Sequence, residues 1–171
     1  MCLFPDEYRA SAYEPDYEGF YARGRRAVIF DIDNTLVPHG FPADERAIRL
    51  FERLKGIGYE CCLLSNNQRE RVEMFNRDVQ VHFIENAHKP LPGGYRRAME
   101  LMGSTVDTTL YVGDQIFTDV MGAGYCGIYT ILVEPIDPHE EIQIVLKRYL
   151  EKPILWAYRL REKLRARKRK R

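Results

Sequence analysis

Four apolar runs of the sequence each end in polar side chains that could do chemistry. Carboxylates follow the first and the fourth run, a hydroxyl and an amide follow the second, and an amine follows the third. The candidate site residues are Asp31, Asp33, Ser65, Asn66, Lys89, Asp114 and Asp119. Ligands of doubly wound parallel sheets bind just beyond the carboxyl ends of the strands, so we expect these side chains to converge at one edge of a sheet.

Asp31 and Asp33 indicate a metal site. Asp31 directly extends an apolar run, and Asp33 follows two residues later. Burying one unpaired carboxylate is costly, and a second carboxylate nearby adds repulsion, so a hard divalent cation is the natural partner. Carboxylate oxygens, waters and a substrate phosphate make the octahedral shell that Mg²⁺ prefers. Asp114 adds a further carboxylate, and no His or Cys is placed to favour a softer metal. The sequence therefore predicts a Mg²⁺ site.

An alternation of strands and helices must position these residues. Five short runs rich in β-branched and aromatic residues are predicted as strands buried on both faces: 27–30, 59–64, 81–84, 109–112 and 128–133. Four segments with helical periodicity lie between them: 44–55, 68–77, 93–102 and 118–122. This alternation favours an α/β fold with three layers, in which a parallel sheet lies between two layers of helices.

Length and composition indicate one globular domain. The 171 residues are 45% hydrophobic and 30% charged, which excludes a wholly disordered, collagen-like or multi-span membrane protein. The formal charge of +1 conceals an asymmetry, because residues 147–171 hold twelve Lys/Arg against two Glu. We therefore divide the chain into a lead-in at 1–25 that packs on the core, a core domain at 26–147 and a basic helix or tail at 148–171.

Cysteine usage and the first residues indicate the compartment. The four cysteines have neither CxxC nor zinc-site spacing, so we expect neither a disulfide framework nor a structural zinc. The first sixteen residues are acidic and contain two prolines, unlike a secretory signal. No run approaches the roughly 20 apolar residues of a transmembrane helix. We expect a cytoplasmic protein, with any membrane contact being peripheral.

Four motifs in order resemble those of the haloacid dehalogenase superfamily of phosphatases. They are DxDNT at 31–35, Ser65 after the second predicted strand, the Lys89-Pro90 pair and GDQxxTD at 113–119. The resemblance spans about residues 26–135. It implies a Rossmann-like fold whose five parallel strands, numbered along the chain, have the order 5-4-1-2-3.

The resemblance also implies a two-step phosphoryl transfer. Asp31 would attack phosphorus and form an aspartyl-phosphate, which splits one difficult displacement into two easier ones. Asp33 would protonate the leaving alkoxide and later deprotonate the hydrolytic water. Mg²⁺ would be held by the carboxylates of Asp31 and Asp114 and by the backbone carbonyl of Asp33, and would neutralise charge on the transferring group.

The remaining motif residues would bind the phosphate. By the same resemblance, Lys89 offers an ammonium to Asp31 and the phosphate oxygens, while the Ser65 hydroxyl and the Asn66 backbone amide donate hydrogen bonds to those oxygens. Asp119 would orient Lys89 or a metal-bound water from outside the first ligand shell. Each residue also has an ordinary structural interpretation: Ser65 could cap the next helix, Lys89 could be a solvated surface lysine, and Asp119 could be a first-turn helix acid.

Members of this superfamily commonly insert a cap domain that reads the substrate, and the spacing here leaves no room for one. Twenty-nine residues separate Thr35 from Ser65 and twenty-three separate Ser65 from Lys89, and one helix and one strand use up each interval. We expect an open site that admits a bulky phosphate monoester on a lipid, a protein or a nucleic-acid end, unless a neighbouring subunit covers it.

The basic tail helps to choose among these substrates. A helix that begins at Pro153 would carry an apolar arc of about 100°, with arginines and lysines around most of the rest. The arc contains Trp156, Ala157, Leu160 and Leu164, whereas Ile154, Leu155 and Tyr158 fall outside it. Such a helix is typical of an interfacial anchor, so residues 153–171 are expected to contact an anionic membrane. A packing helix with a solvated charge run, or nucleic-acid attraction, are the alternatives, and no specific nucleic-acid partner is expected.

Three segments resemble the capless subclass IIIA group related to phosphatidylglycerophosphate phosphatases. They are PDEYRASAYEPDYEGFYARG, IFDIDNTLVP and GDQIFTDVMGA. The resemblance implies cleavage of phosphatidylglycerophosphate to phosphatidylglycerol. A soluble phosphatase for a sugar or nucleotide monoester is the alternative enzyme, since shared chemistry does not define the leaving group. A non-catalytic binding module with a basic tail is the other alternative, and the intact pair of Asp31 and Asp33 speaks against it.

Overall fold

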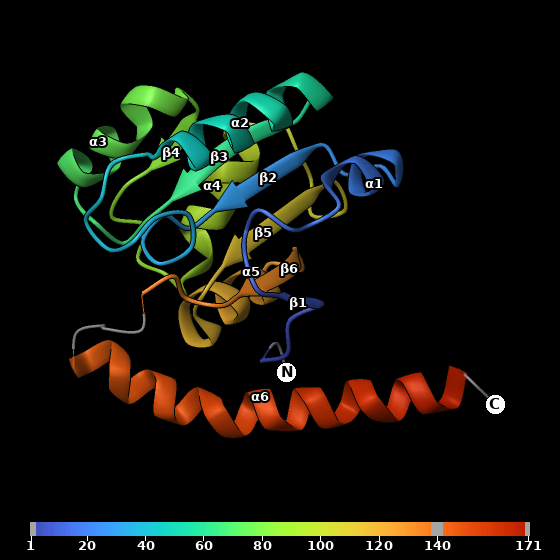
Figure 1. The fold of residues 1–171 in the computed structure, drawn as a ribbon. Coiled ribbons are helices and arrows are strands. Elements are labelled where there is room, and N and C mark those ends of the chain that lie inside the picture. The colour runs from blue at the N-terminus through green and yellow to red at the C-terminus, as the bar shows by residue number, and fades with distance from the viewer. Residues whose placement is uncertain (1–2, 138–141, 170–171) are drawn as a thin grey trace.

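A computed structural model describes the backbone of residues 3–137 and 142–169, and their side chains except at 142–149 and 166–169 (Figure 1). The strands are β1 (Glu7–Arg9), β2 (Ala27–Phe30), β3 (Glu60–Leu64), β4 (His82–Ile84), β5 (Thr109–Gly113) and β6 (Tyr129–Val133). The helices are α1 (Tyr17–Ala22), α2 (Glu45–Ile57), α3 (Arg69–Val79), α4 (Pro92–Leu101), the π-helical turn η1 (Ile116–Val120), α5 (Met121–Tyr125) and α6 (Ile142–Arg169).

The strands form one parallel sheet in the order β1-β6-β5-β2-β3-β4. This confirms the predicted α/β class and the predicted order of five strands. The expected count of five is wrong, because β1 adds a sixth strand at the edge beside β6. β1 has only three residues and its sequence is EYR, so it lacks the apolar run that marks a buried strand.

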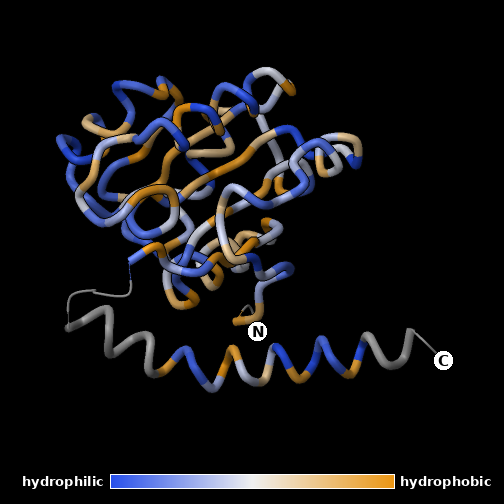
Figure 2. Tube along the Cα trace, in the orientation of Figure 1, coloured by the Kyte–Doolittle hydropathy of each residue, from blue (hydrophilic) through white to orange (hydrophobic). Residues whose placement is uncertain are grey.

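Two layers of helices cover the sheet, one on each face. Alternate residues of each strand face opposite sides, so an apolar strand needs helices on both. Val28 and Phe30 of β2 belong to a core cluster with buried residues of α1, α2 and α3. Ala27 and Ile29 belong to a second cluster with α4 and α5. Figure 2 shows hydrophobic colour along the central strands and hydrophilic colour along much of the outer helices. This three-layer packing fixes the strand ends that carry the candidate site.

The lead-in packs on this core through aromatic residues. The Tyr17 hydroxyl donates to the Ala12 carbonyl at 2.7 Å, and its ring makes an edge contact with Tyr59 at a centroid distance of 6.2 Å. Phe20 makes a similar contact with the ring of Tyr129 at 5.5 Å. The described part of the lead-in, residues 3–25, therefore contributes an edge strand, a helix and part of the core.

The C-terminal helix differs from the expectation. α6 begins at Ile142, and Pro153 lies inside it instead of starting it, so the boundary proposed at 147/148 falls within one helix. Proline favours the first position of a helix, which is why a helix start was predicted at Pro153. It is also tolerated further along a helix, at the loss of one backbone hydrogen bond. None of the described helices is both long and apolar enough to cross a bilayer.

Candidate active site

The central strands bring Asp31 and Asp114 together. Asp31 directly follows β2 and Asp114 directly follows β5, and these strands pair in parallel with Phe30 opposite Val112. The Asp31 backbone N–H continues the ladder by donating to the Val112 carbonyl at 2.9 Å. Both acidic residues are buried, with Asp31 only 7% exposed. The pairing of β2 with β5 therefore brings two buried carboxylates together at the carboxyl edge of the sheet, as the sequence predicts.

A third carboxylate and one ammonium complete the cluster. One carboxylate oxygen each from Asp31, Asp114 and Asp119 lie within 4.8 Å of one another. The Lys89 Nζ donates to Asp31 Oδ1 at 2.6 Å and to Asp119 Oδ1 at 2.7 Å. Three ionised carboxylates against one ammonium leave two excess negative charges in a buried space, which is unfavourable without further compensation. The charge and the all-oxygen donor set fit a hard divalent cation such as Mg²⁺.

The electrostatics of the cluster are dominated by burial. Burial raises the pKa of the Asp31 carboxyl to about 6, against the opposing effect of the Lys89 ammonium. Burial alone would lower the pKa of Lys89, but the Asp119 and Asp31 carboxylates outweigh it and hold that pKa above its ordinary value. Lys89 therefore stays charged, and its interpretation as a solvated surface lysine is wrong.

Asp119 is held in place from several sides. Its Oδ1 accepts hydrogen bonds from Lys89 and from the Tyr111 hydroxyl, the latter at 2.7 Å. Its Oδ2 accepts from the backbone N–H of Gln115 at 3.0 Å, so it also satisfies the start of η1 as a first-turn acid would. Gly113 makes room for it, because a Cβ at that position would lie 2.5 Å from the Asp119 Cγ. Both oxygens already have protein donors, which fits an orienting role.

Ser65 and Asn66 lie in the turn after β3. The Ser65 Oγ is buried and accepts the backbone N–H of Asn67 at 3.1 Å. The N-cap of α3 is Gln68, so the interpretation of Ser65 as the cap of that helix is wrong. The Asn66 side chain clamps the backbone of Lys89, accepting from its N–H at 2.6 Å and donating to its carbonyl at 3.2 Å. This clamp fixes the loop from which Lys89 reaches the cluster.

Asp33 is not one of the three clustered carboxylates and makes a different set of contacts. Its Oδ1 accepts from the Gly40 backbone N–H and from Arg71 Nη2, both at 2.8 Å. Its Oδ2 accepts from Asn67 Nδ2 at 2.7 Å. Arg71 could not be identified from the sequence, because an arginine in the first turn of a helix is an ordinary surface residue. Asn67 follows Ser65 and Asn66 in the polar run after the second predicted strand, and that run is the signal for it.

Thr35, the last residue of the DxDNT motif, also contacts the carboxylate cluster. Its Oγ1 donates to Asp114 Oδ1 at 3.1 Å and lies 3.4 Å from Asp31 Oδ2. It therefore links the loop after β2 to the loop after β5. Its place in the DxDNT motif is the sequence feature from which a role for Thr35 could have been predicted.

The site has no cap. Between Thr35 and Ser65 the structure contains α2 and β3, and between Ser65 and Lys89 it contains α3 and β4, with no inserted domain in either described interval. This confirms the prediction made from the spacing of the motifs.

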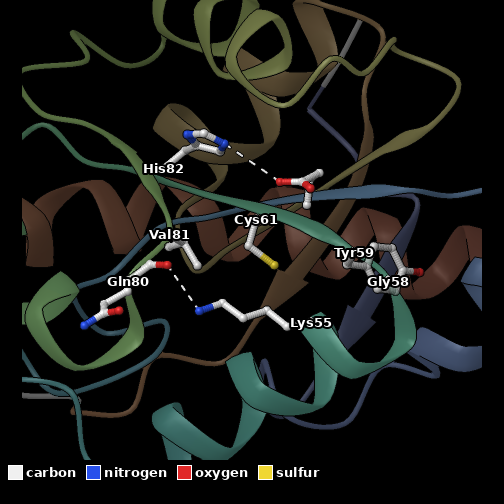
Figure 3. Close-up of a pocket in the computed structure, with 8 residues that line it drawn as sticks. Lys55, Gly58, Tyr59, Cys61, Gln80, Val81 and His82 are labelled. Carbon is white, nitrogen blue, oxygen red and sulfur yellow. Dashed lines mark hydrogen bonds and ion pairs between the residues drawn. The ribbon is translucent and has the colours of Figure 1, made fainter.

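A hollow at the other end of the sheet offers different chemistry. It lies where β3 and β4 begin and is lined by Lys55, Cys61 and His82 among others (Figure 3). The Lys55 Nζ donates to the backbone carbonyl of Val79 at 2.6 Å, and burial raises the pKa of the Cys61 thiol to about 12. A thiol held protonated is a poor nucleophile, so the candidate chemistry lies at the carboxyl edge of the sheet.

Sequence comparisons identify the family of the chain. A family model of haloacid dehalogenase-like hydrolases matches residues 39–127, which include Ser65, Lys89, Asp114 and Asp119. The chain is 33% identical over 156 residues to the "Probable phosphatase YqeG" of Bacillus subtilis, covering 91% of each protein. It is 26% identical over 157 residues to "Phosphatidylglycerophosphate phosphatase 1, chloroplastic/mitochondrial" of Arabidopsis thaliana, covering 80% of this chain and 45% of that protein.

Solved structures share the fold. The cobalt-bound deoxy-D-mannose-octulosonate 8-phosphate phosphatase of Haemophilus influenzae superposes with a TM-score of 0.55 at 16% identity, covering 84% of this chain and 92% of that chain. A haloacid dehalogenase family hydrolase of Deinococcus radiodurans, with bound phosphate and sodium, has a TM-score of 0.56 at 17% identity, covering 73% and 88%. With its buried carboxylate cluster and uncapped sheet edge, the chain belongs to the haloacid dehalogenase-like hydrolases and is a capless phosphatase.

Proposed function

We propose that the protein is a Mg²⁺-dependent phosphomonoesterase that acts through an aspartyl-phosphate on Asp31. The observation that carries this proposal is the buried contact of Lys89 with Asp31 and Asp119 beside Asp114. This contact supports the proposal, because a carboxylate that could act as the nucleophile, an ammonium that could bind phosphate oxygens and a carboxylate that could bind the metal belong to one cluster. The carboxylates of Asp31 and Asp114 and the backbone carbonyl of Asp33 would hold Mg²⁺. When bound, the ion neutralises charge on the phosphoryl group.

The chain's own residues account for each bond that changes. An Asp31 carboxylate oxygen attacks phosphorus while the bond from phosphorus to the ester oxygen breaks, and the leaving oxygen takes a proton from Asp33. Water then attacks the aspartyl-phosphate, Asp33 takes its proton, and phosphate leaves with Asp31 regenerated. Lys89 and Ser65 donate hydrogen bonds to phosphoryl oxygens. Arg71 and Asn67 hold the Asp33 side chain in position between these proton transfers.

We propose phosphatidylglycerophosphate as the preferred substrate. The partial likeness to the Arabidopsis enzyme of that name supports it, as does the absence of a cap over the described site. An open site can bind a phosphate group whose lipid remains in a bilayer. A cap domain would lie between the site and the bilayer surface and would have to move aside.

A substrate panel tests both parts of this proposal. We expect hydrolysis of p-nitrophenyl phosphate that EDTA abolishes and added Mg²⁺ restores. The value of kcat/KM for phosphatidylglycerophosphate in mixed micelles should exceed that for sugar and nucleotide monoesters by at least about 100-fold, since differential transition-state binding defines specificity. Equal or higher values for a soluble monoester would overturn the lipid assignment, and activity that is insensitive to EDTA would overturn the role of the metal.

We further propose that α6 contacts an anionic membrane. Its outward face exposes Trp156, Leu160 and Leu164, with Trp156 69% exposed, and the exposed Lys163 lies on the same side of the helix. Apolar side chains among basic ones fit the boundary between headgroups and acyl chains of an anionic bilayer.

The single tryptophan of the chain lies on this face and reports directly on it. We expect the Trp156 fluorescence to shift to shorter wavelength with vesicles that contain phosphatidylglycerol and not with phosphatidylcholine alone. The double variant Leu160→Ser/Leu164→Ser should weaken binding at least about tenfold, because it removes buried apolar area. Leu101→Ser, an exposed leucine of α4, is the matched control and should bind like the wild type. Unchanged binding by the double variant would contradict the anchor.

A further inference from the structure

A buried carboxylate of α6 contacts the loop of the candidate site. Glu151 is only 3% exposed, and its Oε1 accepts the backbone N–H of Ile116 at 2.7 Å. Glutamates are almost never buried without a partner, and Ile116 itself is fully buried, so water does not reach this N–H. The contact joins positions 35 residues apart in the sequence.

Ile116 is the first residue of η1 and lies between Asp114 and Asp119 in the chain. The first N–H groups of a helical segment have no partner within it, and a carboxylate is favourable at that end. Two carboxylates satisfy successive groups here, because Asp119 accepts from the Gln115 N–H and Glu151 accepts from the Ile116 N–H. Glu151 thus helps to define the path of the chain between two members of the acidic cluster.

The inward face of α6 holds Glu151 at this position. Ile154 and Leu155 pack against a cluster that contains Ile116, Val120 and Leu132. Tyr158 is buried one turn further along, and its ring lies 6.2 Å from that of Phe4. Figure 1 shows α6 lying along the side of the body where β1 and the N-terminal segment are found. The apolar residues that fall outside the outward arc are therefore the ones that attach the helix to the body.

We infer that Glu151 is a positioning residue of the active site, which makes α6 part of the catalytic architecture as well as a surface element. Through Ile116 it holds the loop that places Asp114 for the metal and Asp119 for Lys89. This inference rests on the proposed function in one respect, that the Asp114 loop binds Mg²⁺. The opposite face of the helix stays available to a membrane while the inward face supports the loop.

The test compares three variants by titration calorimetry with Mg²⁺ and by steady-state hydrolysis of p-nitrophenyl phosphate. In Glu151→Leu the side chain cannot accept the hydrogen bond, so we expect the dissociation constant for Mg²⁺ to rise about 10- to 100-fold, as for other residues that orient metal ligands. We expect kcat to fall with KM little changed. Glu151→Gln retains an acceptor oxygen and should stay within about threefold of the wild type. Glu162→Leu, a half-buried glutamate on the same helix, is the matched control.

A merely structural role predicts a different pattern. If Glu151→Leu lowers the melting temperature but binds Mg²⁺ as tightly as the wild type, the inference is overturned. Should that variant fail to fold, Glu151→Asp, which is one methylene shorter, is expected to weaken Mg²⁺ binding at least about threefold, and an unchanged value overturns the inference. Because calorimetry needs no substrate, a wild type that binds Mg²⁺ but hydrolyses no monoester would refute the proposed function and leave this test intact.

Discussion

Asp31→Asn is expected to lower kcat for every phosphate monoester by at least about 10⁴-fold, as loss of a covalent nucleophile does in other enzymes. An amide oxygen does not attack phosphorus to form a stable acyl-phosphate, so no phosphoenzyme should form. Acid quenching of the wild type during turnover, followed by peptide mass spectrometry, should detect a phosphoryl group on Asp31. The variant should show none.

The same variant should remain folded. Asp31 is one of three clustered buried carboxylates and shares the Lys89 ammonium with Asp119, so removal of its charge relieves repulsion, while Lys89 keeps Asp119 as a partner. We therefore expect the melting temperature without metal to be equal to or higher than that of the wild type. Asp78→Asn, which removes a charge from an exposed position on α3, is the matched control and should retain full activity. Activity of Asp31→Asn near the wild-type level would eliminate the proposed nucleophile.

The carboxyl edge of the sheet was predictable because its signals are local. Apolar runs mark the strands, and the polar residue that ends each run must lie at the edge once the strands are parallel. Asp31, Lys89 and Asp119 converge for that reason, although they come from three separate loops. The spacing between motifs likewise predicts the absence of a cap, since a helix and a strand use up the available length.

Contacts between segments distant in the sequence were not predictable in this way. β1 is three residues long and is a strand only because β6 offers it an edge. The pairing of Asp33 with Arg71 and that of Glu151 with Ile116 depend on how α3 and α6 pack, which no periodicity encodes. On a helical wheel the inward residues of α6, which are Ile154, Leu155 and Tyr158, fall outside the apolar arc and so make the helix appear imperfectly amphipathic. In the structure they form a second face, because the helix contacts the body on one side and solvent on the other.

Lys89→Met should be the most destabilising single substitution in the site. Methionine keeps the volume of the side chain but removes the ammonium, so Asp31 and Asp119 lose a partner at 2.6 and 2.7 Å. Removing one member of a buried ion pair costs about 3–5 kcal/mol, because the remaining charge is uncompensated. Urea unfolding without metal should show this loss in the free energy of unfolding, and kcat should fall with it. Lys163→Met, at an exposed position of α6, should change neither the free energy of unfolding nor kcat for the soluble substrate p-nitrophenyl phosphate.

Two further measurements identify charge as the cause of that loss. Adding Asp119→Asn to Lys89→Met removes one uncompensated carboxylate, so the double variant should be more stable than Lys89→Met alone, which is the coupling expected of residues in contact. Mg²⁺ should also raise the free energy of unfolding more in Lys89→Met than in the wild type, because the ion then binds beside a carboxylate cluster in which Asp31 and Asp119 have lost their ammonium. If the two substitutions destabilise additively and Mg²⁺ stabilises both proteins equally, the stability of the site does not depend on the balance between its carboxylates and its ammonium.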